Sequence, residues 1–339
     1  MSAPTDAYVS SPDGTRIYAQ ALGDPSNPPI VFIHGFSLSS VIFDPIFDDP
    51  KWVERLYLIR YDTRGHGQSD KPIEDEFWTS DRIASDFDAV MQRFNVCRPY
   101  VLGWSLGATH LVDILSHHPP SYLRGLLNVN GCPHTGSILP RSITTTAAAA
   151  ISPLLHPSDA EEFQSGALAF VEMLCNPDHP LPLALRRACL ADIMLQPRAV
   201  ARQLVVREQD ASGLLCAVEG EDGGNGRNGR NGRNGGKGVW AWQNGLHDLN
   251  GLNGLNGSAG EEAEELPMLV LLGEKDTLTN LEEVARYMGS RRNCKIVVLP
   301  EAGHTPWIGH SGLFRETVLG WVEEHCEQRY VTTQQESSK

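Results

Sequence analysis

The sequence contains no run of apolar residues that approaches the roughly 18 needed to cross a membrane. Residues 1–6 lack the basic region and the apolar core of a signal peptide. Residues 335–339 match no retention or peroxisomal signal. We therefore expect a chain without a membrane span or a targeting segment.

Cysteine is sparse and scattered. The cysteines form no C-x-x-C pair and their number, seven, is odd, so we expect neither a zinc site nor a disulfide framework. We interpret them as small buried hydrophobic residues of a protein in a reducing compartment, and we expect a cytoplasmic location. They stand at positions 97, 132, 175, 189, 216, 294 and 326.

Positively charged residues are also few. The chain has 28 lysines and arginines against 42 aspartates and glutamates, which gives a net charge of −14. Such an acidic chain is a poor partner for nucleic acid or for an anionic membrane surface. It has no phosphate loop of the form G-x-x-x-x-G-K-[ST], and the glycines around His66 are too weak a pattern for a dinucleotide site. We expect a small-molecule substrate, no cofactor and no metal; the oligomeric state stays open.

What is present is ordinary for a globular protein, with 41% hydrophobic and 21% charged residues. Apolar runs typical of buried strands alternate with helical patterns, and Asp13-Gly14 indicates an N-terminal hairpin. This alternation predicts an α/β fold with a mostly parallel central sheet and helices on both faces. We expect strands at residues 7–10, 16–20, 30–33, 56–61, 100–102, 123–130, 268–272 and 295–299, and helices at 79–94, 108–115, 281–289 and 313–327.

A helical insertion interrupts this alternation, because residues 140–218 carry helical patterns and no convincing strand. An insertion at this place lies over the strand ends, where α/β sheets bind their ligands. We therefore divide the chain into a core (1–133 and 266–330), a helical cap (134–218), a low-complexity insertion (219–265) and a flexible tail (331–339).

The low-complexity insertion repeats the units Asn-Gly-Arg and Asn-Gly-Leu. Such a segment buries too little apolar surface to offset its chain entropy, so we expect it to be mostly disordered. Repeat expansion in a tolerant surface loop explains it, and an interaction tract is the alternative.

The most informative motif is G-W-S-L-G at residues 103–107, between an expected strand and an expected helix. A serine in a G-x-S-x-G turn takes a strained backbone conformation that displays its hydroxyl above the sheet. The glycines avoid crowding against the neighbouring strand and helix. Ser105 is therefore the candidate nucleophile, provided that a base and an acid come from elsewhere in the chain.

Two polar loops supply those partners in the chain order Ser, Asp, His that this type of fold uses. Asp276 follows the strand expected at 268–272, and His304 follows the one expected at 295–299. Parallel strands present their carboxyl ends at one edge of a sheet, so both side chains should come near Ser105. Glu274 is a rival for the acid, since it lies two residues before Asp276.

An acyl-transfer site also needs two backbone donors for the oxyanion. We predict the N–H of Leu106, directly after the nucleophile, and that of Phe36, in the loop after the strand at 30–33. We expect His34, in the same loop, to hold the loop in place through a hydrogen bond rather than to exchange protons. Phe36 and Trp104 are candidate substrate-pocket residues, although for Trp104 we favour the alternative that it simply fills the core.

A third polar loop, residues 61–69, contains Asp62, Arg64 and His66 and could be taken for a binding site. We favour a structural role, in which Asp62 and Arg64 satisfy loop backbone groups and each other.

These motifs make the chain resemble the α/β-hydrolase superfamily. The matching pieces are H-G-F at 34–36, D-T-R-G-H-G-Q-S at 62–69, the Ser105 turn, G-E-K-D at 273–276 and G-H at 303–304. The resemblance covers the core and is loose over the cap. It implies Ser105 as nucleophile, His304 as base, Asp276 as acid, and an oxyanion hole at Phe36 and Leu106. The subgroup resembled comprises esterases, non-haem haloperoxidase-like proteins and carbon–carbon bond hydrolases.

Three functions compete on this basis. The first is a carboxylesterase-type serine hydrolase that acts on a small or medium organic ester through an acyl-enzyme. The second is hydrolysis of a carbon–carbon bond, as in a β-diketone, with the same triad, and the third is a non-catalytic binding module. Serine at the turn argues against dehalogenases and epoxide hydrolases, in which a carboxylate forms the ester.

Overall fold

The computed structural model describes residues 3–215 and 266–336. The low-complexity insertion expected at 219–265 and residues 337–339 of the expected tail lie outside the described residues. The described part of the chain forms an eight-stranded sheet of order β1-β2-β4-β3-β5-β6-β7-β8. The strands are β1 (Thr5–Ser10), β2 (Arg16–Leu22), β3 (Pro29–Ile33), β4 (Tyr57–Tyr61), β5 (Tyr100–Trp104), β6 (Gly125–Val129), β7 (Met268–Gly273) and β8 (Cys294–Leu299).

The sheet is mostly parallel, as predicted. The expected hairpin is the antiparallel pair β1 and β2, and β2 also pairs antiparallel with β4. From β4 through β8 every neighbouring pair is parallel. The carboxyl ends of β3, β5, β6, β7 and β8 therefore meet along one edge, which is where the candidate site lies.

Helices cover both faces of the sheet because side chains alternate along the buried strands. In β3, Ile30 and Phe32 join the cluster that contains Trp52 and Phe314, whereas Val31 and Ile33 join the other cluster. One face thus packs on α1 (Asp44–Phe47), α2 (Pro50–Val53) and α12 (Ser311–Glu336). The other face packs on α3 (Ser80–Arg93), α4 (His110–His117), α10 (Ser212–Leu215) and α11 (Leu281–Met288).

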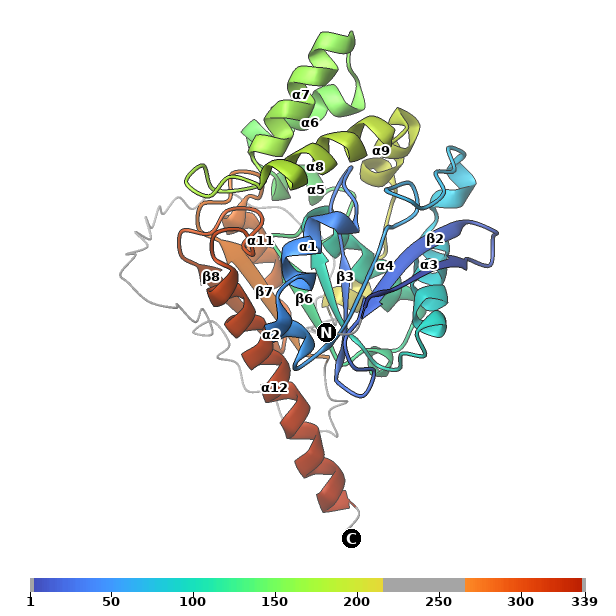
Figure 1. Ribbon diagram of the computed structural model, residues 1–339, viewed down its shortest axis with the longest axis vertical. Coiled ribbons are helices and arrows are strands. Elements are labelled where there is room, and N and C mark those ends of the chain that lie inside the picture. The colour runs from blue at the N-terminus through green and yellow to red at the C-terminus, as the bar shows by residue number, and fades with distance from the viewer. Residues whose placement is uncertain (1–2, 216–265, 337–339) are drawn as a thin grey trace, which may run out of the picture.

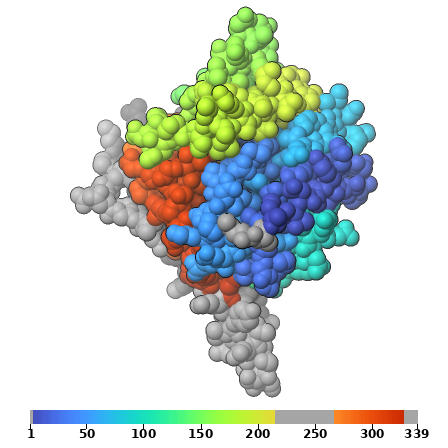
Figure 2. All heavy atoms as spheres, in the orientation of Figure 1, coloured from blue at the N-terminus to red at the C-terminus, as the bar shows by residue number. Residues whose placement is uncertain are grey.

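The described residues between β6 and β7 are helical and contribute no strand to the sheet. Figure 1 shows α6, α7, α8 and α9 gathered at one end of the molecule, and Figure 2 shows them lying across one end of the core; we refer to this helical layer as the cap. The helices of this segment before α10 are α5 (Leu139–Ser142), α6 (Thr145–Leu155), α7 (Ala160–Glu172), α8 (Leu183–Leu195) and α9 (Arg198–Val206). Four short 3-10 helices complete the described elements, namely η1 (Ser40–Phe43), η2 (Asp75–Trp78), η3 (Ser105–Thr109) and η4 (Pro120–Tyr122).

Two details differ from the sequence prediction. The segment expected to belong to the cap as far as residue 218 already returns to the core at α10, where Leu214 is buried in the cluster that contains Leu111 of α4. The closing helix, expected to end at residue 327, continues to Glu336 into the expected tail. Within the described ranges, no helix is both long enough and apolar enough to cross a membrane.

Candidate active site

Ser105 lies directly after β5, at the turn into η3 and α4. Its φ of 55° is in the left-handed region, which non-glycine residues rarely adopt. The backbone at this position is therefore strained, as the G-x-S-x-G motif predicts.

The two motif glycines are required because backbone approaches them closely. A Cβ on Gly103 would lie 2.4 Å from the Cα of Ala108 in η3. A Cβ on Gly107 would lie 2.2 Å from the carbonyl oxygen of His34, just beyond β3. The predicted crowding against the helix and the neighbouring strand is thus present on both sides of Ser105.

The structure brings Asp276 and His304 together from the ends of β7 and β8. The Nδ1 of His304 lies 2.8 Å from the Oδ2 of Asp276, and both side chains are buried. The other carboxylate oxygen of Asp276 accepts from the N–H groups of Leu278 at 2.8 Å and Thr279 at 3.2 Å. Since the carboxylate can only accept, it holds His304 as the Nδ1–H tautomer, in which Nε2 carries the free lone pair.

The His304 Nε2 atom is buried and has no hydrogen-bond partner among the described residues. The structure contains no hydrogen bond between this nitrogen and the Ser105 hydroxyl. In serine hydrolysis such a hydrogen bond has to be in place only when the substrate is bound. Ser105 and His304 are nevertheless linked through Trp104, whose ring centroid lies 5.2 Å from that of His304.

Trp104 and Asn130 hold the main chain of His304. The indole N–H of Trp104 donates to the His304 carbonyl at 2.8 Å, and the amide of Asn130 donates to the same carbonyl at 3.0 Å. Trp104 is completely buried, which favours the core alternative over a pocket wall.

Sequence reasoning missed Asn130. This side chain also accepts from the N–H of Gly273 at 2.7 Å and donates to the Gly303 carbonyl, so it ties together the loops after β6, β7 and β8. The available signal was its place directly after β6, between the strands that lead to Ser105 and Asp276, with a φ of 46° that asparagine tolerates.

The rival acid Glu274 does not contact His304. Its carboxylate accepts instead from the backbone N–H of Glu301 at 3.0 Å, near the protein surface. The geometry therefore assigns the contact with the histidine to Asp276.

The two expected oxyanion donors lie in the loop after β3 and at the start of η3. Neither the Phe36 N–H nor the Leu106 N–H donates a hydrogen bond to another described residue. The N–H of Leu106 has no acceptor because it belongs to the first turn of a helix. Both side chains are buried, and the ring of Phe36 packs edge-on against Phe170 of cap helix α7, with centroids 6.0 Å apart.

His34 is placed as a brace for the Phe36 loop. Its Nε2 accepts from the N–H of Thr63 at 3.0 Å, so Nδ1 carries the proton and donates to the Gly35 carbonyl, also at 3.0 Å. Burial lowers the pKa of His34, which keeps the ring neutral.

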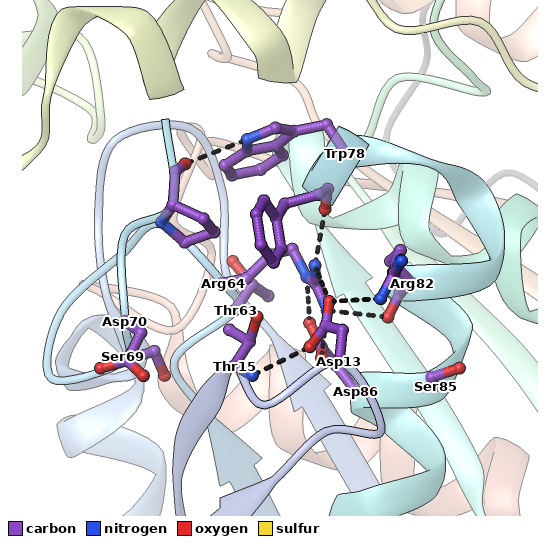
Figure 3. Close-up of polar contacts among 12 residues, drawn as sticks. Asp13, Thr15, Thr63, Arg64, Ser69, Asp70, Trp78, Arg82, Ser85 and Asp86 are labelled. Carbon is purple, nitrogen blue, oxygen red and sulfur yellow. Dashed lines mark hydrogen bonds and ion pairs between the residues drawn. The ribbon is translucent and has the colours of Figure 1, made fainter. Parts of the chain in front are cut away.

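The third polar loop has structural partners, although not the pairing we expected. Asp62 accepts from Ser40 and from the N–H of Gln68, whereas Arg64 pairs with two other carboxylates. Figure 3 shows the buried guanidinium between Asp86, which it meets through two hydrogen bonds of 2.6 and 2.7 Å, and Asp13, at 2.9 Å. Asp62 and Arg64 therefore do not satisfy each other.

The sequence comparisons point to the same fold. Residues 28–164 match a family model described as alpha/beta hydrolase fold. The chain is 37% identical over 108 residues to the Mycobacterium tuberculosis protein named "Probable oxidoreductase EphD", a match that covers 32% of this chain and 18% of that protein. It is 33% identical over 103 residues to rhodomycin D methylesterase DnrP of Streptomyces peucetius, covering 29% of this chain and 33% of that protein. The aligned segments thus span about a fifth to a third of these curated relatives.

Solved structures resemble nearly the whole chain. The esterase RhEst1 from Rhodococcus sp. ECU1013 has a TM-score of 0.72 at 20% identity, and the match covers 94% of this chain and 98% of that chain. The esterase EaEST from Exiguobacterium antarcticum has a TM-score of 0.66 at 18% identity, with coverage of 94% and 100%. Identities this low establish the fold alone.

The sheet order, the strand–turn–helix at Ser105 and these matches identify the chain as a protein of the α/β-hydrolase fold. The similar proteins named above include two esterases of the same fold and a methylesterase.

Proposed function

We propose that the chain is a serine hydrolase that cleaves a carboxylic ester of a small or medium organic molecule through an acyl-enzyme. The observation that carries this proposal is the buried Asp276–His304 pair, with a free Nε2, at the same sheet edge as the strained Ser105. A nucleophile, a base and a group that orients the base are the minimum set for acyl transfer.

In the proposed reaction, His304 Nε2 removes the proton of the Ser105 hydroxyl while the serine oxygen attacks the ester carbonyl. Asp276 stabilises the imidazolium and keeps the ring oriented. The resulting oxyanion accepts from the N–H groups of Phe36 and Leu106. His304 then passes its proton to the departing alkoxide, and the acyl group stays on Ser105.

Water completes the cycle by the same steps. His304 takes a proton from a water molecule, which attacks the acyl carbonyl and forms a second oxyanion in the same position. Collapse of this intermediate releases the carboxylic acid, and the proton returns from His304 to Ser105. No cofactor or metal is needed at any step.

The choice of an ester as substrate rests on the esterase and methylesterase names among the similar proteins. The buried contact of Phe36 with Phe170 of the cap supports a substrate whose acyl group is apolar.

The test combines active-site labelling with a substrate panel. A fluorophosphonate probe should label the folded wild-type protein at Ser105, and the protein should hydrolyse 4-nitrophenyl esters of short to medium chain length. Ser105→Ala should abolish labelling and lower kcat on the order of 10⁶-fold, because the three residues act as a unit. Substantial turnover by the alanine variant would contradict the assignment.

A β-diketone panel tests the alternative carbon–carbon cleavage. If the probe labels Ser105 but the protein hydrolyses diketones and not esters, the same three residues would catalyse carbon–carbon bond cleavage instead of ester hydrolysis. Failure of the folded wild-type protein to react with the probe would favour a non-catalytic binding module.

A further inference from the structure

The loop that carries His304 is held from two sides. On the core side, Trp104 and Asn130 both donate to the His304 carbonyl, as described above. On the other side the loop contacts residues 174–176, a cap segment that begins just after α7 ends at Glu172. The core also binds the carbonyls of Ala302 and Gly303. The cap contacts act on the residues that flank this stretch, Glu301 and Thr305.

Thr305, the residue after His304, is fixed to the cap by two hydrogen bonds. Its backbone N–H donates to the carbonyl of Leu174 at 2.8 Å, and its hydroxyl donates to the same carbonyl at 2.7 Å. Both Thr305 and Leu174 are completely buried. Both lone pairs of one cap carbonyl are thus directed at the residue that follows His304.

A third hydrogen bond lies on the other side of the histidine. The side-chain amide of Asn176 donates to the carbonyl of Glu301 at 2.8 Å, and Asn176 is itself buried. The cap therefore holds the loop both before and after His304.

Gly303 brings the two segments into direct backbone contact. A Cβ at this position would lie 2.3 Å from the backbone nitrogen of Asn176 and 2.7 Å from the carbonyl carbon of Cys175. Only glycine permits this approach without displacement of the loop or the cap. The glycine before His304 therefore makes room for the cap as well as shaping the loop.

We infer that the cap segment Leu174–Asn176 (hereafter the cap clasp) is a positioning element for His304. This inference rests on the proposed function, in which His304 is the base. Thr305 is the positioning residue that transmits the contact, because its backbone continues directly from His304. If the cap moved off the core, His304 would keep its contacts with Trp104, Asn130, Asp276 and Thr279 but would lose those made through Thr305. Its Nε2 would then be presented less accurately to Ser105.

Thr305→Val tests the cap clasp most cleanly. Valine has the shape of threonine and keeps the backbone N–H, but it removes the hydroxyl donor to Leu174. A small misplacement of a catalytic group costs up to about 10²-fold in rate. We therefore expect kcat for a 4-nitrophenyl ester, and the rate of fluorophosphonate labelling of Ser105, to fall about 10- to 100-fold, with KM changed much less.

Thr305→Ser keeps the hydroxyl and should restore both rates to within a few-fold of wild type. Thr317→Val is the matched control, because the hydroxyl of Thr317 also donates to a backbone carbonyl, that of Leu313, within α12 and away from the site. It should leave both rates unchanged. The rates are referred to the folded fraction measured by circular dichroism, so that lost stability does not count as lost catalysis.

Asn176→Ser is a second variant, measured in the same way, in case the buried valine prevents folding. It shortens the donor to Glu301 and should lower the labelling rate in the folded fraction. Wild-type labelling rates in folded Thr305→Val, or in folded Asn176→Ser where the valine variant does not fold, would overturn the inference and leave the proposed function standing. Failure of the wild-type protein itself to label would overturn both.

Discussion

Arg64 is the most densely bonded charged side chain of the third polar loop. Its guanidinium is fully buried and pairs with Asp86 and Asp13, which are also buried. Its remaining N–H groups donate to the carbonyls of Phe77 and Arg82. Because every direction of the planar group is used, Arg64 has no donor left for a ligand, and its role is to join the loop to the β1–β2 hairpin and to α3.

Removal of Arg64 should destabilise the fold severely. Arg64→Met leaves the buried carboxylate of Asp86 without its cation and leaves Asp13 with only the partly exposed Arg82. Breaking a buried ion pair from one side costs about 3–5 kcal/mol. We expect the free energy of unfolding, measured by urea denaturation at neutral pH, to fall by that amount.

The neighbouring Arg82 provides the matched control. It lies 3.3 Å from the same Asp13 carboxylate, but its side chain is 37% exposed. Partly solvated pairs of this kind contribute about 0–1 kcal/mol, so Arg82→Met should change the free energy of unfolding by less than about 1 kcal/mol. A similar decrease in the free energy of unfolding for the two variants would show that the buried ion pairs of Arg64 do not stabilise the fold as we describe.

At the scale of elements, helix α8 anchors the cap to the loop after β3. Asp192 accepts from the hydroxyl of Ser39 at 2.6 Å, and one turn later Gln196 accepts from the hydroxyl of Ser37 at 2.5 Å and donates to Gly65. Gln196 directly follows the last residue of α8, and its N–H still donates to the carbonyl of Asp192, so both polar side chains lie on the same face at the helix end. That face holds the loop in which Phe36 supplies an expected oxyanion donor.

Asp192 makes this contact sensitive to pH. Burial raises the pKa of Asp192 to about 6, with a further contribution from the charge of Asp62. In the unfolded chain an aspartate has a pKa of about 3.9. Between these values the folded protein binds more protons than the unfolded chain, so the contribution of Asp192 to stability decreases as pH rises from about 4 to 6.

Asp192→Asn should therefore stabilise the protein above pH 6. The asparagine oxygen still accepts from Ser39, and no buried charge forms. We expect a free energy of unfolding about 1–2 kcal/mol above wild type at pH 7.5, which allows for partial solvation of the carboxylate, and a difference near zero at pH 4. Glu208→Gln, at an exposed position near the end of the cap, is the control. A stability at pH 7.5 equal to or below that of wild type would refute the prediction.

At the scale of the whole molecule, three histidines are buried beneath the site. Burial lowers the pKa of His34, and it lowers the pKa values of His66 and His110 well below the usual range. The ring centroids of His34 and His66 lie 4.8 Å apart, so a proton on one ring would disfavour a proton on the other. The folded protein therefore keeps these rings neutral where an unfolded histidine, with a pKa of about 6.5, is protonated.

This group should make the fold acid-labile. Below about pH 6.5 the unfolded chain binds protons that the folded protein excludes, so the free energy of unfolding falls as pH decreases. Each such histidine contributes up to about 1.4 kcal/mol per pH unit, so the three together exceed the opposite trend of the single Asp192. We expect a steep loss of stability between pH 6.5 and 5 in urea denaturation series.

His66→Gln should reduce the change of the free energy of unfolding with pH by up to about 1.4 kcal/mol per pH unit, the contribution of one histidine. Substitution of the exposed His156 by glutamine should leave this pH dependence unchanged. A free energy of unfolding that stays constant from pH 6.5 to 5 in the wild-type protein would contradict this account of the buried histidines.

The sequence by itself determined the strands, the mostly parallel sheet, the turn at Ser105 and the loops that carry Asp276 and His304. These features depend on local patterns: apolar runs predict buried strands, and glycines mark turns that need close backbone approach. Because parallel strands end at one edge, the order of the motifs also predicted that the three candidate residues converge.

Tertiary structure decided everything that joins residues distant in the chain. Asn130 ties three loops together, Arg64 pairs with Asp86 rather than Asp62, and Thr305 is bound by Leu174 of the cap. No local pattern specifies these partners, because each hydrogen bond exists only after separate elements have packed and left a buried donor facing a buried acceptor. The sequence therefore indicated the chemistry expected of the site, whereas packing between distant elements decided how its groups are held.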